Sequence, residues 1–259
     1  MQASPKPPST LVFNVQYGPF GPETWQLGNG LYGVTAYDSE GRNAGGWLCN
    51  GSSQSGCSGG TQLYGYSISW TGQNLTGACD TALGQCASYG YDNLDQLDSR
   101  TITSGNPGGF SYAYDRWGNR WQQNVTSGSG PQPQLSFNTS TNEIQTSGYD
   151  YDAAGNLTSD GLDSYTYDAN GNVISVSGAD NATYTYDALN QRVQISASGS
   201  DSLEFVYNLN GQRVSIWDGS TGSQIQGQAY WGMSPVEFYE SGAAHFQFQD
   251  WEGTERVQT

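Results

Sequence analysis

The residue types that catalysis requires are scarce in this chain of 259 residues. Its only histidine, His245, lies in the alternating stretch Ala244-His-Phe-Gln-Phe248, and Ser-His-Asp catalysis would depend on that imidazole. One GxSxG match covers residues 56–60, but it lies in a Gly/Ser-rich cysteine loop and lacks the strand and helix that flank a nucleophile elbow. We interpret His245 as a strand-surface residue, and the sequence predicts no nucleophilic catalysis.

Acidic residues are the one abundant reactive type, with 24 Asp and Glu in total. Glycosidases use two carboxylates, and close pairs occur here at Asp150/Asp152, Asp160/Asp163 and Glu237/Glu240. With so many acids such pairs arise by chance, and many of the aspartates stand at turns. The stretch Asp168-Ala-Asn170-Gly-Asn172 partly resembles the start of a calcium loop, without its distal Glu. The sequence therefore predicts no enzyme and no cofactor, with calcium binding as a weaker alternative.

The composition indicates an ordered, turn-rich chain. Mean hydropathy is −0.62, yet aromatic residues reach 13% and charged residues only 12%, whereas disordered chains are usually aromatic-poor and charge-rich. The 36 glycines suit a fold with many tight turns. The elements that position any site are therefore expected to be strands joined by short turns.

The charge balance excludes several classes of partner. Net charge is −16, with Lys6 as the only lysine, and such an acidic surface repels phosphate backbones and anionic membranes. No stretch approaches the roughly 20 apolar residues of a membrane span, and the start MQASPKPPST lacks the apolar core of a signal peptide. We expect no nucleic-acid binding and no membrane insertion, and we predict that residues 1–13 are a flexible Pro/Ser-rich lead-in.

Four cysteines, Cys49, Cys57, Cys79 and Cys86, form no CxxC metal pair. Four cysteines allow three disulfide connectivities. The short spacings favour the local pairs Cys49–Cys57 and Cys79–Cys86, with free buried thiols as the alternative. Structural disulfides would place the protein in an oxidising compartment, secreted, extracellular or at the cell surface.

A short motif recurs along the chain. Its aromatic-Asp pair is found at Tyr37-Asp38, Tyr91-Asp92, Tyr114-Asp115, Tyr151-Asp152, Tyr167-Asp168, Tyr186-Asp187 and, with Asn in place of Asp, Tyr207-Asn208. In the later copies a second aromatic stands two residues before the tyrosine, which places both rings on one face of a strand. In these later copies a glycine follows the Asp or Asn, as a hairpin needs where φ is positive, or in one copy Asn190. These glycines are Gly118, Gly155, Gly171 and Gly211. The leading Asp can accept backbone N–H groups as an Asx-turn.

Each repeat is therefore predicted to be a β-hairpin of about 20 residues. An isolated hairpin is marginal in water, but adjacent hairpins can pair edge to edge, with aromatics stacked across the strands. We predict an all-β fold of tandem antiparallel hairpins that form one continuous curled or spiralling sheet. Residues 14–146 are expected to hold diverged repeats with the cysteine-containing loops, and residues 147–259 the regular repeats.

The repeated Tyr-Asp with its Gly-Asn or Gly-Arg turn resembles the YD repeats of the bacterial Rhs family, which are related to repeats in teneurins and in the shell component of insecticidal Tc toxins. Residues 17–31, 36–42 and 248–257 also resemble Rhs sequence, so the resemblance covers roughly residues 14–257. It implies a β-sheet ribbon that spirals into a hollow shell around a cargo, often a toxin, and that is closed by DPxG-type motifs. This sequence contains no DPxG motif. We therefore expect a shell segment, or a short protein that uses the repeats differently.

Three functions are consistent with the sequence. The first is a segment of an Rhs-type shell around a cargo polypeptide, for which the gene would continue past Thr259 into DPxG motifs. The second is a secreted structural protein that forms a homo-oligomer or filament through uncapped sheet edges. The third is a cell-surface adhesin that binds glycans through exposed tryptophans, although such residues more often pack a sheet face. We predict a non-enzymatic secreted scaffold, and the choice between shell and filament stays open.

Overall fold

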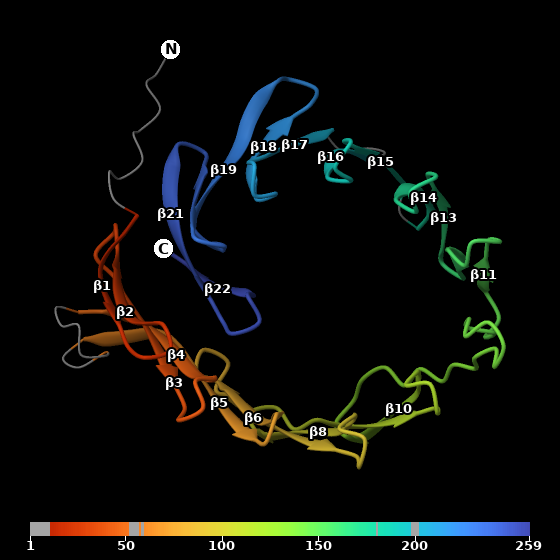
Figure 1. Cartoon of the computed structure of the whole chain (residues 1–259), viewed down its shortest axis with the longest axis horizontal. Helices are drawn as coiled ribbons and strands as arrows, with labels where there is room; N and C mark the ends of the chain where they lie inside the picture. Colours follow the sequence, from red (N-terminus) through yellow and green to blue (C-terminus); the bar gives the residue numbers. More distant parts are fainter. Residues whose placement is uncertain (1–10, 52–56, 58–59, 180, 198–201) are drawn as a thin grey trace. The chain divides into compact units, whose positions relative to one another are not determined.

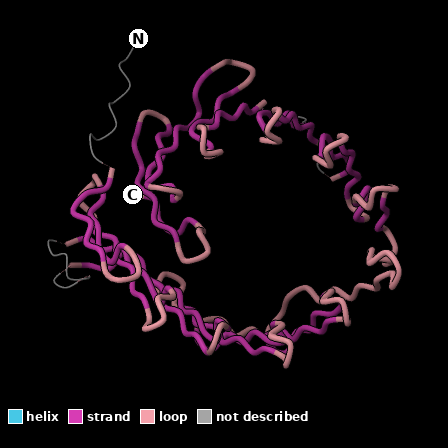
Figure 2. The backbone as a smooth tube through the Cα atoms, viewed as in Figure 1, coloured by secondary structure: helices cyan, strands magenta, loops and turns pink. Residues whose placement is uncertain are grey.

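The computed structural model describes residues 11–51, 57, 60–179, 181–197 and 202–259 (Figure 1). These residues form strands, turns and loops (Figure 2), and they include no helix long and apolar enough to cross a membrane. The predicted lead-in lies outside the described residues as far as residue 10. Its last two residues already belong to the first strand, which begins at Val12, so order starts earlier than predicted.

The strands form two antiparallel sheets. The first contains β1 Val12–Tyr17, β2 Pro22–Leu27, β3 Tyr32–Tyr37, β4 Asn43–Asn50, β5 Thr61–Thr71, β6 Asn74–Asp80, β7 Gln85–Tyr91, β8 Leu97–Ser104, β9 Gly109–Tyr114 and β10 Arg120–Ser127. The second contains β11 Tyr149–Tyr151, β12 Leu157–Asp160, β13 Asp163–Tyr167, β14 Val173–Gly178, β15 Ala182–Tyr186, β16 Arg192–Ala197, β17 Leu203–Tyr207, β18 Arg213–Asp218, β19 Ser223–Trp231, β20 Ser234–Glu240, β21 Ala243–Gln249 and β22 Glu255–Gln258.

Strand order follows chain order in both sheets, which is the arrangement of consecutive hairpins. The all-β hairpin fold is as predicted, but the single continuous sheet is not, because residues 128–148 separate two sheets. Pro131 and Pro133 in this segment lack the N–H that a ladder requires. The segment contributes to two isolated bridges, Gln122 with Gln134 and Phe137 with Ile144.

The chain divides into two compact units. Unit one comprises Met1–Gln134, Tyr230–Glu237 and Ala244–Thr259. Unit two comprises Leu135–Ala229 and Phe238–Ala243. Unit one therefore contains both ends of the chain, whereas unit two contains most of the regular repeats.

The hydrophobic core of unit one is built from both ends of the chain. Its buried residues are Leu27, Leu48, Tyr64, Tyr66, Ile68, Phe246 and Phe248. The first five lie on β2, β4 and β5, and the two phenylalanines lie on β21. Phe246 and Thr259 exchange two backbone hydrogen bonds of 3.1 and 3.0 Å, and the Asn29 side chain donates to the Thr259 hydroxyl (2.7 Å). The C-terminal hairpin β21–β22 is therefore docked on the N-terminal strands.

Two glycines let tryptophan rings lie flat on neighbouring strands in unit one. Trp25 stands directly opposite Gly33, and Trp47 stands opposite Gly65. A Cβ added at either glycine would overlap the indole of its partner. A side chain at these positions would push the ring off the sheet, so glycine is what permits the close packing.

Unit two is a thin sheet with little apolar burial. On β13 the rings of Tyr165 and Tyr167 are half-buried, whereas Ser164 and Thr166 are exposed, and β15 repeats the same alternation. Among the described hydrophobic residues of this unit, Phe205 and Phe238 are the ones that are fully buried. Because apolar burial is small, the stability of unit two must come largely from hydrogen bonds and cross-strand pairs.

Candidate functional site

The aspartate of each repeat closes its hairpin turn. In the turn that begins at Asp168, the Asp168 N–H donates to the Asn172 carbonyl (2.9 Å) and the Gly171 N–H donates to the Asp168 carbonyl (3.1 Å). The Oδ1 of Asp168 accepts the backbone N–H groups of Asn170 (2.8 Å) and Asn172 (2.9 Å). Gly171 has a φ of 81°, a left-handed conformation that favours glycine. Each turn is thus held by its own backbone and by one carboxylate.

The same hydrogen-bond pattern recurs at turns that begin at Asp38, Asp92, Asp115, Asp152, Asp187, Asn208 and Asp250. The fourth residue has a positive φ in each, and where it is not glycine it is Asp95 or Asn190, both at 59°. Asn and Asp tolerate this region better than most residues. The Asp250 turn was missed from the sequence because Gln249 stands where the other turns have tyrosine. The Asp250–Gly253 spacing, which matches the other turns, is the signal that identifies it.

Hydrogen bonding favours the ionised form of three turn aspartates. The pKa of Asp115, Asp152 and Asp168 is lowered, first by the side-chain amide of the asparagine four residues later and then by backbone N–H groups of the turn. Their oxygens are therefore engaged by donors of their own turn. No group of three or more His, Cys, Asp or Glu side chains that could hold a metal ion occurs in the part of the chain that the structure describes. The turn accounts for the Asp168–Asn172 stretch that resembles a calcium loop.

The tyrosine of each repeat ties its strand to the preceding hairpin through its hydroxyl. The donor and carbonyl-acceptor pairs are Tyr37–Pro22 (3.4 Å), Tyr91–Leu75 (2.8 Å), Tyr114–Leu97 (2.8 Å), Tyr167–Leu157 (2.6 Å), Tyr186–Val173 (3.0 Å) and Tyr207–Arg192 (2.9 Å). At Tyr151 the hydroxyl instead accepts the Ile144 N–H (3.2 Å). We call these six donor bonds the tyrosine staples. The Tyr-Asp pair therefore has two tasks, since the Asp closes one turn and the Tyr joins that hairpin to the one before it.

Sequence reasoning assigned this tyrosine to ring stacking and missed the staple. The signal was present, because the residue before the Asp or Asn is tyrosine in all seven copies found in the sequence, the Asp250 turn with Gln249 not being among them, whereas the aromatic two residues earlier is Phe205 in one copy. Stacking alone would accept either ring. A hydroxyl that never varies among the copies indicates a hydrogen bond.

In three of the repeats the earlier aromatic ring has a different task, because an arginine after the turn stacks over it. The pairs, with the distance from guanidinium carbon to ring centroid, are Arg120–Tyr112 (5.3 Å), Arg192–Tyr184 (5.3 Å) and Arg213–Phe205 (5.5 Å). Such cation–π contacts contribute about 0.5–1 kcal/mol at exposed sites. Either a tyrosine or a phenylalanine supplies the ring, which explains why Phe205 occurs at this position.

The four cysteines form two local disulfides, Cys49–Cys57 and Cys79–Cys86. Cys79 and Cys86 stand directly opposite each other on β6 and β7. Cys49 lies near the end of β4 and is joined to Cys57 in the loop that follows. These are the pairs that the short spacings favour, and each constrains a small loop of the unfolded chain.

Two of the residues considered for catalysis, His245 and Asp160, take structural positions. His245 is half-buried on β21. The Asp160 carboxylate accepts two backbone N–H groups of its own turn and the Tyr165 hydroxyl (2.8 Å). These bonds, the backbone ones first, lower the pKa of Asp160, and the contact with Asp160 raises the pKa of Tyr165 to about 12. The GxSxG match, residues 56–60, lies largely outside the described residues.

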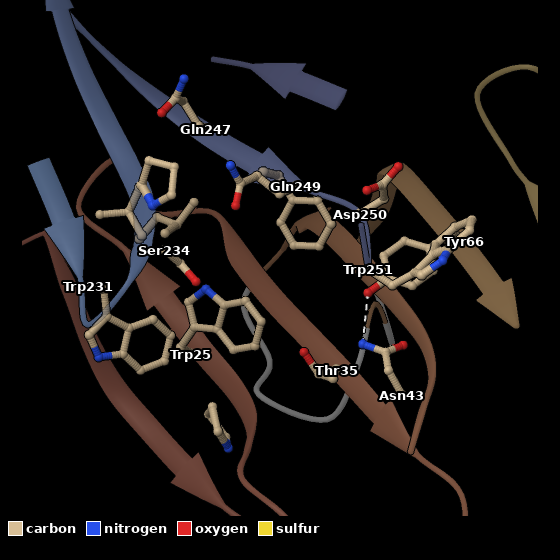
Figure 3. A pocket seen from close by; sticks show the side chains of 15 residues that line it. Trp25, Thr35, Asn43, Tyr66, Trp231, Ser234, Gln247, Gln249, Asp250 and Trp251 are labelled. Carbon is tan, nitrogen blue, oxygen red and sulfur yellow. Dashed lines mark hydrogen bonds between the residues drawn. The ribbon is translucent and has the colours of Figure 1, made fainter. Parts of the chain in front are cut away.

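An aromatic pocket lies in unit one, where the docked C-terminal hairpin meets the first strands (Figure 3). Its volume is about 280 Å³. Its aromatic lining consists of Trp25, Tyr66, Trp231, Phe248 and Trp251. Its polar lining consists of Thr35, Asn43, Ser234, Gln247, Gln249 and Asp250. The Asn43 amide donates to the Tyr66 hydroxyl (3.0 Å), so part of the wall is held by an internal hydrogen bond.

A family comparison assigns the repeat region. The model of the teneurin YD-shell family matches residues 77–218, which is more than half of the chain. Two curated relatives are the tRNA3(Ser)-specific nuclease WapA of Bacillus spizizenii and the tRNA nuclease WapA of Bacillus subtilis, 37% and 36% identical over 111 residues. These matches cover 40% of this chain and span only 5% of each relative.

Solved structures share the fold. The chain resembles a mutant Tc holotoxin pore of Photorhabdus luminescens with a TM-score of 0.72 at 14% identity, over 96% of this chain and 15% of that one. It also resembles TcdB2-TccC3 without its hypervariable C-terminal region, with a TM-score of 0.54 at 12% identity, over 94% of this chain and 17% of that one. At these identities the likeness establishes the architecture of the hairpin sheets.

Proposed function

Since the chain belongs to the teneurin YD-shell family, we propose that it is a non-catalytic structural scaffold, a wall segment of a shell around a polypeptide cargo. The observation that carries this proposal is the repeated combination of a self-closing turn with a tyrosine staple. With this combination each further hairpin closes its own turn and bonds to the hairpin before it, so all the groups that join the repeats lie in neighbouring hairpins. A wall built in this way lengthens without a thick hydrophobic core.

The surface of unit two suits a wall that must release its contents. Between the half-buried tyrosines, the exposed strand residues include Ser164, Thr166, Thr183 and Thr185. On β13 and β15 this hydroxyl-rich surface differs from the contiguous apolar patches that mark tight protein–protein interfaces. A polypeptide behind such a surface would be enclosed without being bound tightly.

The sheet edges favour a discrete wall segment over a growing filament. The segment after β10 covers that strand, because the Gln123 N–H donates to the Pro133 carbonyl (3.1 Å) and the Val125 N–H donates to the Gln132 side chain (3.0 Å). Strand β1 is irregular, with shifted register and a φ of 52° at Asn14. Strand β11 has only 3 residues. Covered, irregular and short edge strands are devices that prevent edge-to-edge association.

A secreted or cell-surface location is part of the proposal. It is supported by the two disulfides, because such bonds persist in oxidising compartments. The WapA relatives are named as tRNA nucleases, but the shared region is 5% of their length. We assign to this region the scaffold and not the nuclease chemistry, in keeping with the structural positions of His245 and Asp160.

Light scattering coupled to size-exclusion chromatography, followed by electron microscopy, tests the wall segment against the filament. We expect a particle near the 27.8 kDa of one chain at every concentration. Filaments that grow with concentration would overturn the wall proposal in favour of self-assembly. The same preparation should leave tRNA intact, and cleavage that follows the folded protein through purification would overturn the non-catalytic assignment.

The enclosing role is tested in the natural protein that contains this sequence. Protease should spare an enclosed polypeptide while the wall is folded, and should degrade it when Tyr167→Phe, Tyr186→Phe and Tyr207→Phe together remove the staples of unit two. Tyr184→Phe, which keeps the ring that stacks with Arg192, is the matched control. The proposal of enclosure is wrong if the polypeptide is degraded equally in the wild-type protein, the triple variant and the Tyr184→Phe control.

A further inference from the structure

The aromatic pocket of unit one is a feature that a shell wall does not require. Trp25 and Tyr66 come from N-terminal strands, and Trp231 and Trp251 come from the C-terminal part of the chain (Figure 3). The volume of about 280 Å³ is close to the lower end of the range of about 300–1,000 Å³ for small-molecule sites. The pocket is therefore of a size for one ring of a small ligand.

The rings of the pocket are held in place before any ligand binds. Trp25 lies 5.6 Å from Trp231 between ring centroids and stacks at 15° with Phe248 at 6.5 Å. Tyr66 and Trp251 pair at 5.1 Å. The Trp25 indole also packs directly on Gly33 of the neighbouring strand, so it has contacts on the sheet as well as with the other rings. Rings that are already ordered reduce the entropic cost of binding.

Hydroxyl and amide side chains also line the pocket. They belong to Thr35, Ser234 and Gln249, and to Asn43 and Gln247, whose amides also donate to Tyr66 and Glu255. Amides and hydroxyls together supply donors and acceptors for sugar hydroxyls, while the C–H face of a sugar ring packs against an aromatic face. We propose that this pocket binds a neutral saccharide, with one pyranose ring against its tryptophans.

Charge selects against ionic ligands. Among the described residues that line the pocket, Asp250 is the only charged one. Its carboxylate already accepts the backbone N–H groups of Glu252 (2.9 Å) and Thr254 (3.0 Å) and the Arg256 guanidinium (2.7 Å). A ligand carboxylate or phosphate would find no cationic partner in the lining. A quaternary ammonium would contact the rings but leave the amides and hydroxyls without a role.

Ser234 is an exposed residue of the lining, so a larger side chain at this position would fill the pocket while every ring and amide of the lining is kept. We would titrate the purified chain with neutral mono- and disaccharides, choline and glucuronate, by isothermal calorimetry. We expect saturable binding of at least one neutral sugar and none of choline or glucuronate. Ser234→Phe should weaken that binding at least tenfold, whereas Ser69→Phe, at an exposed serine on β5 outside the lining, should leave it unchanged.

A second variant keeps the test decisive if Ser234→Phe fails to fold. Gln249→Ala removes a half-buried amide of the lining and should weaken sugar binding while near-ultraviolet circular dichroism stays native. The proposal is overturned if no neutral sugar binds, if choline or glucuronate binds in preference, or if both pocket variants bind sugar like the wild type. These outcomes leave the scaffold proposal untouched, because the staples and turns of unit two do not contribute to the pocket.

Discussion

Removing the hydroxyl of Tyr186 is the sharpest test of the tyrosine staple. In Tyr186→Phe the ring stays, and the hydrogen bond to the Val173 carbonyl (3.0 Å) is lost. One such bond contributes about 0.5–1.5 kcal/mol to the free energy of unfolding. Tyr167 and Tyr207 make equivalent bonds in unit two. Neighbouring staples are two strands or about 9.5 Å apart, so their losses should add, and the triple variant should lose about 1.5–4.5 kcal/mol.

Urea denaturation followed by circular dichroism measures these losses. The matched control is Tyr184→Phe, two residues earlier on the same strand, whose ring stacks with Arg192 at 5.3 Å and is kept by the substitution. The control should stay within about 0.5 kcal/mol of the wild type. The slope of the transition with urea should not change, because none of these substitutions alters the surface exposed on unfolding appreciably.

The comparison of Tyr184→Phe with Tyr186→Phe decides whether the tyrosine hydroxyl at the turn joins the hairpins. If Tyr184→Phe and Tyr186→Phe cost the same, the hydroxyl at the turn has no special task and the repeat is held by ring stacking alone. If the triple variant loses less than one single substitution is expected to cost, hairpins are not joined through these hydroxyls. Either result would refute the account of the Tyr-Asp pair.

The core, the turns and the covered edge each make a testable prediction. Phe248→Ala should cost about 3–5 kcal/mol because it empties the core of unit one, whereas Phe20→Ala at an exposed position should cost less than about 0.5 kcal/mol; equal urea midpoints would contradict the docked C-terminal hairpin. The lowered pKa of Asp115, Asp152 and Asp168 gives stability that is complete above their ordinary value of 3.8 and is lost as pH falls through the lower folded value. The urea concentration at the midpoint of unfolding should therefore decrease when the pH is lowered below about 4. A midpoint that does not change with pH in this range would contradict the stabilising role of these carboxylates. Pro131→Thr with Pro133→Thr restores N–H groups at the edge beside β10 and should increase self-association in light scattering. Pro107→Thr is the control, and a double variant as monomeric as that control would argue against edge protection.

The repeat turns could be predicted from the sequence because their requirements are local. A glycine or asparagine must occupy the left-handed position, and Asn190 does so at a φ of 59° as its residue type allows. The Asp250 turn lacks the preceding tyrosine that marks the other turns in the sequence, although Gly253 stands at the same spacing as the other glycines. The staple escaped for another reason, since a hydroxyl that reaches the preceding hairpin depends on strand pairing and not on spacing.

The docked C-terminal hairpin and the aromatic pocket could not be predicted, because both depend on contacts between the two ends of the chain. Phe246 and Phe248 alternate with polar residues as strand residues do elsewhere in the sequence. Nothing in that alternation indicates that they pack on Leu27 and Tyr64. The separation into two sheets, by contrast, could be predicted from the sequence. Pro131 and Pro133 indicate a break in the strand ladder, which the number of repeats alone does not show.

The staple also explains how so polar a chain can form a thin sheet. With a mean hydropathy of −0.62 and few buried apolar residues in unit two, hairpins cannot be joined by a second layer. A valine or phenylalanine in place of Tyr186 would still pack against the sheet, but the Val173 carbonyl would lose the hydroxyl that donates to it. Further apolar residues would add adhesive surface to a sheet exposed on its faces. Tyrosine meets both needs, because its ring fills the pleat and its hydroxyl bonds the preceding hairpin while adding no apolar surface.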